Sequence, residues 1–212
     1  MNRPYVFINC AMSVDGKIAN PFGKQIKISC EEDIKRMYKL RNDSDAVLVG
    51  INTVLSDDPK LTVKEKYIKK PKQPIRIVLD TFCKTPVDAN VVNDKAKTII
   101  VVGSECDKKF GSNVEILKCK TNENNFIDLE NLLDILFKRG IKKLMVEGGS
   151  TVISNFLKNG FVDDLFIYVG SMIIGGKNTP ALVNSNCKNI KLKLVAAKNI
   201  GTGVLLHYRL IK

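Results

Sequence analysis

The order of apolar and polar residues divides the chain into strands and helices that mostly alternate. Short apolar or alternating runs predict strands, and apolar residues repeated every three or four positions predict helices. The expected strands are residues 5–11, 46–50, 75–79, 98–102, 114–117, 144–146, 164–169, 192–197 and 204–210. The expected helices are residues 30–40, a short helix between Thr53 and Pro59, an apolar stripe over 129–137, and a helix around 152–157. This order predicts an α/β fold with a mostly parallel central sheet, helices on both faces and an antiparallel C-terminal edge.

The turn between the strand at 144–146 and the helix that follows is a candidate binding site. Gly148 and Gly149 let the backbone approach a ligand, and the free N–H groups of a first helical turn favour a phosphate. We expect Ser150 or Thr151 to cap this helix. Glu147, at the end of the strand, would face the same crevice. Taken alone, Gly-Gly-Ser is equally compatible with an ordinary turn.

Other small or polar residues also follow predicted strands. In an open α/β sheet, ligands bind beyond the carboxyl ends of the strands. The residues expected there are Ala11, Gly50, Thr53, Asp80, Thr81, Gly103, Gly148 and Gly149. The sequence has neither the G-x-G-x-x-G fingerprint nor a Walker A motif, so a nucleotide site must be of another type.

Length and charge limit the classes of protein that remain. We expect one domain over residues 1–212, because 212 residues with 44% hydrophobic content can bury a substantial core. The net charge is +12, but the 34 Lys and Arg are scattered without interleaved aromatic residues, so we expect no nucleic-acid partner. Attraction to anionic small molecules and a lysine-rich background explain this charge equally well. We find neither a secretory signal nor a membrane-length apolar stretch, which predicts a cytoplasmic protein without a membrane partner.

Cysteine and histidine usage argues against several chemistries. The six cysteines form no C-x-x-C pair, and we expect them to be reduced apolar fillers, without a zinc site or a disulfide framework. His207 is the only histidine and lies in the alternating C-terminal strand, where a structural role is expected. A histidine-based triad and a multi-histidine metal site are therefore excluded, and no metal is expected.

Four stretches together resemble a known family. Residues 12–19, 49–63, 76–81 and 145–151 are similar, in the same order, to the reductases of riboflavin biosynthesis, and the resemblance extends over nearly the whole chain. It implies a three-layer fold similar to dihydrofolate reductase. The chain departs from the family pattern at 170–172, where Gly-Ser-Met replaces Ala-Pro-Lys, and at Lys64, where relatives often have arginine.

The resemblance also implies roles for individual residues. Contacts to NADPH, with NADH left open, are implied for Ala11, Thr53, Asp57, Thr81, Val102, Gly103, Gly148, Gly149, Ser150, Thr151 and Val152. Contacts to the substrate are implied for Gln25, Arg41, Leu61, Lys64 and Glu147. Arg41 and Lys64 suit a ribose phosphate, which needs permanent positive charge.

The implied reaction is hydride transfer to the ribosylamino group of a phosphorylated pyrimidine. Glu147 or Asp15 is a candidate proton relay. A reductase of the deaminated pyrimidine and a non-catalytic nucleotide-binding relative are the alternatives. A homodimer is implied as well, and the apolar segment 165–174 could supply its interface if it lies at a sheet edge. The alternative is that these side chains fill the core of the monomer.

Overall fold

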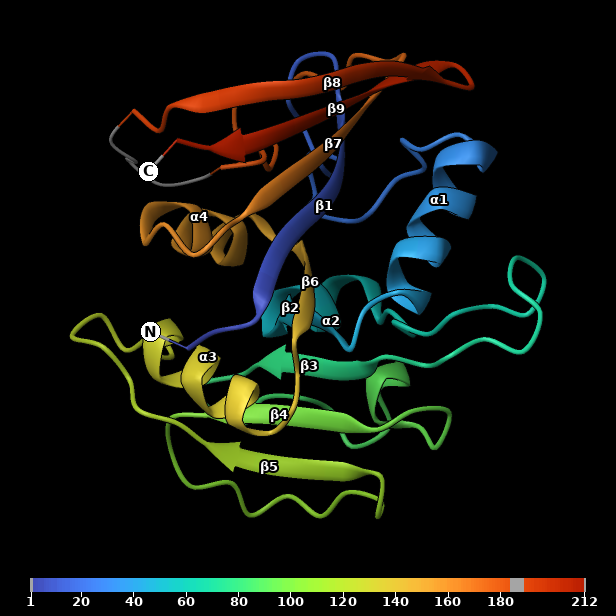
Figure 1. Cartoon of the computed structure of the whole chain (residues 1–212). Helices are drawn as coiled ribbons and strands as arrows, with labels where there is room; N and C mark the ends of the chain where they lie inside the picture. Colours follow the sequence, from blue (N-terminus) through green and yellow to red (C-terminus); the bar gives the residue numbers. More distant parts are fainter. Residues whose placement is uncertain (1, 184–188, 212) are drawn as a thin grey trace. The chain divides into compact units, whose positions relative to one another are not determined.

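We analysed a computed structural model, which describes residues 2–183 and 189–211 (Figure 1). Cys187, one of the six expected apolar fillers, lies outside the described residues. The strands are β1 (Tyr5–Ser13), β2 (Ala46–Gly50), β3 (Ile75–Leu79), β4 (Thr98–Val102), β5 (Val114–Lys118), β6 (Lys143–Gly148), β7 (Asp164–Gly170), β8 (Leu192–Ile200) and β9 (Gly203–Leu210). The helices are α1 (Glu31–Asn42), α2 (Ile51–Asp57), the 3₁₀ helix η1 (Asn90–Val92), α3 (Leu129–Lys138) and α4 (Ser150–Lys158).

The predicted elements are confirmed, with differences at their ends. Strands β2, β3 and β4 have the predicted bounds, because strands covered on both faces are mostly apolar. Helix α2 begins at Ile51, two residues before the expected start, with Gly50 as its N-cap. The helix η1 was not predicted, because three residues are too short for an apolar period to be recognised.

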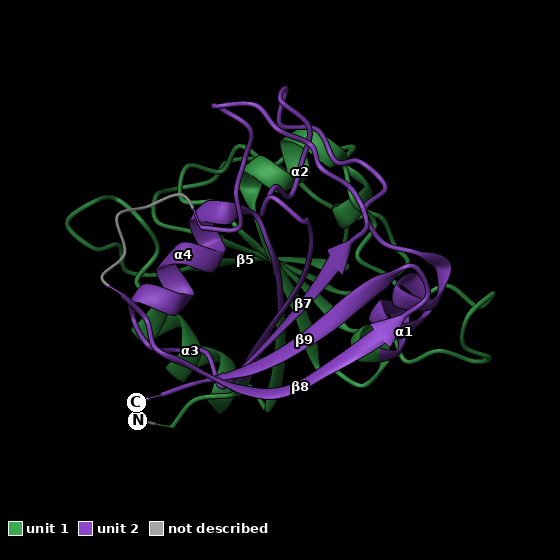
Figure 2. Ribbon diagram, turned by 90° about the horizontal axis from the view of Figure 1, so that it is seen from above, with its two compact units in different colours: residues 1–5, 40–145 green, residues 6–39, 146–212 purple. Residues whose placement is uncertain are grey.

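The nine strands form one mixed sheet in the order β5-β4-β3-β2-β6-β1-β7-β9-β8. This confirms the predicted α/β class with antiparallel C-terminal strands. The chain also divides into two compact units, coloured separately in Figure 2. Unit 1 consists of the chain up to Tyr5 and of Leu40–Met145, and unit 2 consists of Val6–Lys39 and of the chain from Val146 onwards.

Unit 1 is built on the parallel strands β2 to β5. Figures 1 and 2 show α2 and α3 on opposite faces of these strands. The right-handed crossover rule explains this, because α2 leads outward from β2 to β3 whereas α3 leads back from β5 to β6. The fully buried side chains of unit 1 include Leu48, Ile77, Ile100, Leu132, Leu133 and Leu136. Asp128 caps α3 by accepting from the amides of Glu130 and Asn131.

Unit 2 joins a parallel pair to an antiparallel edge. Strand β1 runs parallel to β7, and β7 runs antiparallel to β9, which pairs with the edge strand β8. Strand β7 is therefore an interior strand, and the expectation that segment 165–174 lies at an edge was wrong for its first half. Strands β1 and β9 flank β7, and its side chains Leu165, Ile167 and Tyr168 are buried on the faces of the sheet.

Candidate functional site

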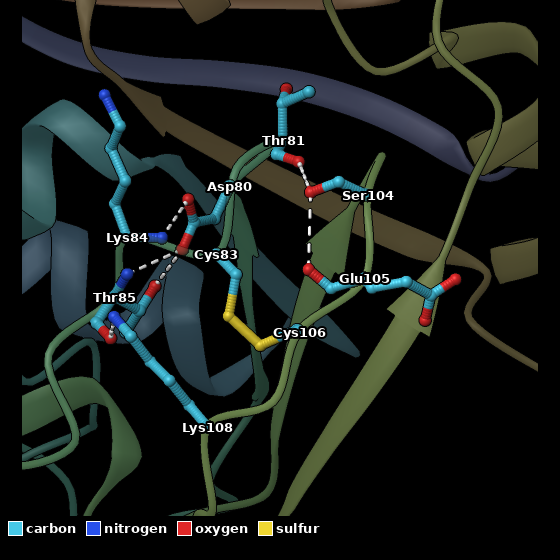
Figure 3. The surroundings of a disulfide bond; sticks show 9 residues. All are labelled: Asp80, Thr81, Cys83, Lys84, Thr85, Ser104, Glu105, Cys106 and Lys108. Carbon is cyan, nitrogen blue, oxygen red and sulfur yellow. Dashed lines mark hydrogen bonds between the residues drawn. A yellow bond between two sulfur atoms is a disulfide. The ribbon is translucent and has the colours of Figure 1, made fainter.

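Unit 1 brings together the expected cofactor residues at the ends of β3 and β4. Asp80 is fully buried, and its carboxylate accepts from the amides of Lys84 (2.8 Å) and Thr85 (2.7 Å). This fixes the turn that carries Thr81 (Figure 3), and the Thr81 carbonyl accepts from the amide of Gly103 at 3.0 Å. A Cβ at position 103 would lie 2.9 Å from Thr81 Cγ2 and 2.4 Å from Thr121 Cγ2, so only glycine fits.

A disulfide between Cys83 and Cys106 joins the same two turns (Figure 3). The expectation that all cysteines are reduced was wrong for this pair. The two residues are 23 positions apart, and only the parallel pairing of β3 with β4 brings their Cα atoms to 5.6 Å. Cys10, Cys30 and Cys119 remain thiols, and burial raises the pKa of Cys119 to about 11.

Helix α2 carries the expected cofactor residues Thr53 and Asp57, both half-buried. The helix ends at Asp57, and its C-cap Asp58 has φ 41°. The Asp58 carboxylate accepts from the amide of Asn90 (2.7 Å) and from its side-chain nitrogen (2.6 Å). These bonds attach the end of α2 to η1 and thereby hold the α2 turn in place.

The expected substrate residues of unit 1 lie on two segments that contact each other. Arg41 is buried, and its Nη1 donates to the carbonyl of Thr62 at 3.0 Å. Leu61, next to Thr62, is 1% exposed and has φ 50°. Lys64 is exposed at the end of this segment. The structure therefore places Arg41 against the segment that carries Leu61 and Lys64, and the substrate assignment stays a prediction.

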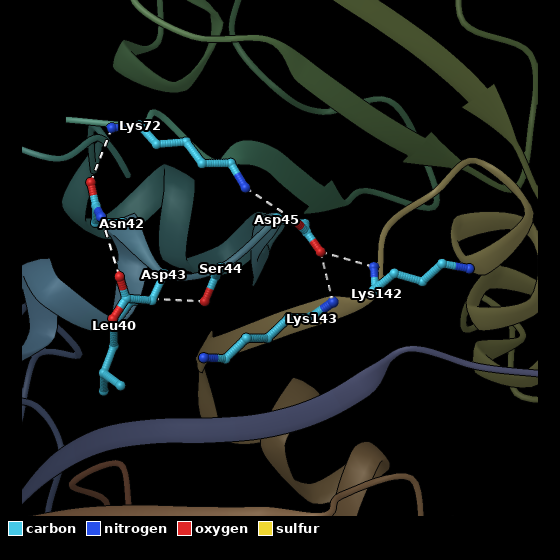
Figure 4. A network of polar contacts seen from close by, with 8 residues as sticks. All are labelled: Leu40, Asn42, Asp43, Ser44, Asp45, Lys72, Lys142 and Lys143. Carbon is cyan, nitrogen blue, oxygen red and sulfur yellow. Dashed lines mark hydrogen bonds and ion pairs between the residues drawn. The ribbon is translucent and has the colours of Figure 1, made fainter. Parts of the chain in front are cut away.

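A polar network anchors the chain just after Arg41 (Figure 4). The Asp45 carboxylate accepts from the amides of Lys142 and Lys143 at 3.0 Å each, and from Lys72 Nζ at 3.0 Å. Partial burial opposes ionisation, but these hydrogen bonds outweigh it and lower the pKa of Asp45 below its usual range. Sequence reasoning missed Asp45, because its partners lie in distant segments.

In unit 2, two glycines form the turn between β6 and α4. Gly148 has φ 125°, a conformation that L side chains rarely adopt. Gly149 is the N-cap of α4, and as a glycine it has no side chain with which to cap this helix. The expected cap was wrong: the Ser150 hydroxyl instead donates to the carbonyl of Ala181 at 2.5 Å. The amides of the first turn therefore remain suited to a bound anion.

The remaining expected site residues, on α4, β6, β1 and the loop before α1, differ in how far their side chains are exposed. Thr151 is half-buried and Val152 is 8% exposed, so Val152 offers backbone more than side chain to a ligand. Glu147 is half-buried at the end of β6. Ala11 is half-buried in β1, where it pairs with Tyr168. Gln25 is exposed in the loop before α1.

Asp15 is not suited to donate a proton near neutral pH. Its carboxylate accepts from the Ser13 hydroxyl (2.6 Å) and from the amides of Ile174 (3.0 Å) and Gly175 (2.8 Å). These bonds lower the pKa of Asp15 to about 2, and the bond from the Ser13 hydroxyl has the largest effect. Asp15 is therefore dropped as a candidate proton relay, and the relay role of Glu147 stays a prediction.

One departure from the family pattern, at Gly170, and the lone histidine also have structural explanations. A Cβ at Gly170 would lie 2.6 Å from the carbonyl oxygen of Ile28, so the loop before α1 packs too closely for alanine. His207 Nε2 lies 2.5 Å from Asp164 Oδ1, and its ring stacks on Phe166. This partner fits the expected structural role.

No group of metal-ligating side chains and no helix long and apolar enough to cross a membrane occurs in residues 2–183 and 189–211.

The architecture and the glycine-rich strand-to-helix turns define an α/β protein with the fold of dihydrofolate reductase. Dihydrofolate reductase from Enterococcus faecalis matches 98% of the chain with a TM-score of 0.53 at 11% identity, which supports the fold alone. The model of the RibD C-terminal domain matches residues 4–206. The chain belongs to the RibD C-terminal domain family.

Full-length relatives and solved structures agree with this membership. The chain is 38% identical to the 2,5-diamino-6-ribosylamino-4(3H)-pyrimidinone 5′-phosphate reductase of Archaeoglobus fulgidus, over 98% of both chains. The enzyme of that name from Methanothermobacter thermautotrophicus is 37% identical over 97% of this chain and 98% of its own length. The riboflavin biosynthesis reductase Rib7 of Saccharomyces cerevisiae has a TM-score of 0.83 at 27% identity, covering all of this chain and 91% of the other. A bifunctional deaminase and reductase from Thermotoga maritima has a TM-score of 0.84 at 29% identity, but this chain covers only 57% of it.

Proposed function

We propose that this protein reduces the ribosylamino group of 2,5-diamino-6-ribosylamino-4(3H)-pyrimidinone 5′-phosphate to a ribitylamino group, in riboflavin biosynthesis. The observation that carries this proposal is the end-to-end match to reductases of that substrate, at 38% identity over 98% of both chains. The enzyme is an oxidoreductase, and we propose a cytoplasmic location, as expected from the sequence.

We propose NADPH as the cofactor. When bound, it would supply the hydride that reduces C1′ of the opened ribose. The N-terminus of α4, where the N-cap is Gly149, suits its pyrophosphate, with Gly148, Gly149, Ser150, Thr151 and Val152 as the contacting residues. Further contacts are proposed for Ala11, Thr53, Asp57, Thr81, Val102 and Gly103. The bond between Thr81 and Gly103 supports a joint role for those two residues.

We propose that the substrate is held through its phosphate and its base. Arg41 and Lys64 supply positive charge for the phosphate, and the contact between Arg41 and residue 62 supports their joint action. Leu61, Gln25 and Glu147 complete the proposed contacts. Because the hydride comes from the cofactor, these residues serve alignment and the exclusion of water, with Glu147 as the proposed proton relay.

The proposed homodimer now depends on surfaces other than β7. Ile173 is 77% exposed, and the edge strand β8 exposes Leu194 (53%) and Val195 (44%). An unpaired apolar edge of this kind favours pairing with a second copy.

The function is tested by incubating purified protein with NADPH and either the diaminopyrimidinone or its deaminated counterpart, and following cofactor oxidation. We expect a higher kcat/KM for the diaminopyrimidinone. A preference for the deaminated compound would transfer the assignment to the reaction of the bifunctional enzymes. Cofactor binding without oxidation of NADPH by either substrate would identify a non-catalytic relative.

A further inference from the structure

The turn after β1 is joined to a distant segment by an unusual number of polar contacts. We call residues 172–182 the clamped segment. The Val14 amide donates to the carbonyl of Met172 (2.9 Å), and the Ile18 amide donates to that of Pro180 (2.9 Å). The Leu182 amide donates back to the carbonyl of Gly16 (3.3 Å). The 13–18 turn therefore holds both ends of the clamped segment.

Asp15 supplies the side chain at the centre of this arrangement. One carboxylate oxygen accepts from the amide of Ile174 and the other from the amide of Gly175, at 3.0 and 2.8 Å. The hydroxyl of Ser13, which is fully buried, donates to the first of these oxygens at 2.6 Å. An exposed aspartate with three donors is oriented as an acceptor, so its role is to fix the backbone that it binds.

The clamped segment in turn contacts the first turn of α4. The carbonyl of Ala181 accepts from the Ser150 hydroxyl, and Ala181 pairs with Lys17 in an isolated antiparallel bridge. A continuous path of hydrogen bonds and chain therefore runs from Asp15 through the clamped segment to Ser150. It also explains why Ser150 does not cap its own helix, because its hydroxyl is used by Ala181.

We propose that Asp15 is a positioning residue, which fixes the clamped segment against Ser150 and so holds the first turn of α4 in the conformation that binds the cofactor pyrophosphate. This inference rests on the proposed function, because it takes α4 as the pyrophosphate-binding helix. Asp15 acts on cofactor affinity through backbone position and does not transfer a proton.

The first test is Asp15→Asn, which preserves shape but replaces one acceptor oxygen by an NH₂ donor that cannot accept from an amide. Hydrogen exchange should be faster at the amides of Ile174 and Gly175. The Kd for NADPH should rise roughly tenfold, the effect of losing about one charge-assisted hydrogen bond. At saturating NADPH, kcat and its pH profile should stay as in the wild type. Asp107→Asn removes one exposed carboxylate elsewhere and serves as the matched charge control.

A double-mutant cycle tests the path itself. Ser150→Ala alone should also raise the Kd for NADPH. The double variant should raise the Kd by less than the product of the two single fold-changes, since both substitutions break the same path. Ser13→Ala gives a second way to loosen Asp15 if Asp15→Asn fails to fold. Its effects on exchange and Kd should be smaller and in the same direction.

The outcomes separate this inference from the function on which it rests. Unchanged exchange and an unchanged Kd in folded Asp15→Asn would overturn the positioning role. A lower kcat at saturating NADPH with an altered acidic limb of the pH profile would also overturn it, in favour of proton transfer. A wild-type protein that does not bind NADPH would refute the proposed function instead, and hydrogen exchange would still show whether Asp15 holds the clamped segment.

Discussion

At the scale of single residues, position in the structure changes how each candidate can be tested. Arg41 and Lys64 were assigned together to the substrate phosphate, yet Arg41 is buried against Thr62 whereas Lys64 is exposed. Replacing Arg41 would leave its buried surroundings without a partner and would lower stability together with binding. Lys64 is therefore the cleaner probe of phosphate recognition.

Lys64→Ala should raise the KM for the phosphorylated substrate roughly tenfold, equivalent to about 1.4 kcal/mol, because a charge-assisted contact is lost. The Kd for NADPH should stay nearly constant. Steady-state kinetics at two salt concentrations are the measurement, and the difference between variant and wild type should shrink at high salt. Lys69→Ala, another exposed lysine of the same loop, is the matched control and should leave KM unchanged. Equal effects of the two substitutions would remove Lys64 from the phosphate site.

At the scale of elements, the turns at the carboxyl ends of the strands are held by contacts that no single turn contains. Asp80 and the disulfide fix the turns after β3 and β4, whereas the 13–18 turn fixes the surroundings of α4. Each of these turns carries proposed cofactor residues or contacts one. Rigid support of this kind keeps a binding turn in its productive geometry.

Gly149→Val should weaken NADPH binding severely while the protein still folds. The φ of Gly149 is −74°, which any residue adopts, so the substitution chiefly fills the space beside the proposed pyrophosphate. Gly148→Val is the informative comparison, because φ 125° is strained for valine and should lower thermal stability as well. Calorimetric titration with NADPH and thermal unfolding of both variants are the measurements. An unchanged dissociation constant in folded Gly149→Val would return this turn to a purely structural role.

Replacing Cys83 and Cys106 together by serine should lower the free energy of unfolding by about 3 kcal/mol, because the disulfide closes a loop between residues 23 positions apart. Denaturant unfolding with and without dithiothreitol is the measurement. The wild type should lose a similar amount of stability on reduction, while the double variant should not respond. If thiol titration finds both cysteines reduced in the purified native protein, this contribution to stability is absent.

At the scale of the whole molecule, two surface properties bear on binding: the net charge of +12 and the exposed apolar residues at the edge of the sheet. The charge favours the approach of anionic molecules, such as the proposed substrate and cofactor, over neutral competitors. The exposed apolar residues of β8, together with Ile173, are the surface that a second copy would cover. One substitution in β8 and one at Ile173 can show which of these two places forms the dimer interface.

A mass measurement at micromolar concentration should show a dimer, at twice the monomer mass of 23.6 kDa. Leu194→Lys places a charge on the open edge of β8, and Ile173→Glu places one in the clamped segment. The substitution that yields monomers identifies the interface, since a buried charge without a partner strongly opposes association. A wild-type monomer at this concentration would end the dimer proposal.

The sequence by itself determined the elements and the family. Residues 46–50, 75–79 and 98–102 were recognised because a strand buried on both faces is mostly apolar, and α3 because its apolar residues recur at helical spacing. Four ordered stretches were sufficient to indicate the family. These signals depend on residues that are neighbours in the chain, or on whole stretches that relatives share.

Only the tertiary structure decided which distant groups meet. It paired Cys83 with Cys106, gave the Ser150 hydroxyl to a carbonyl 31 residues away, and directed Asp15 to amides about 160 positions further on. It also placed β7 between β1 and β9 and buried Leu165, Ile167 and Tyr168, so these apolar side chains belong to the core and not to an interface. The physical reason is that periodicity records which face of an element is buried, whereas the partner on that face depends on the path of the whole chain.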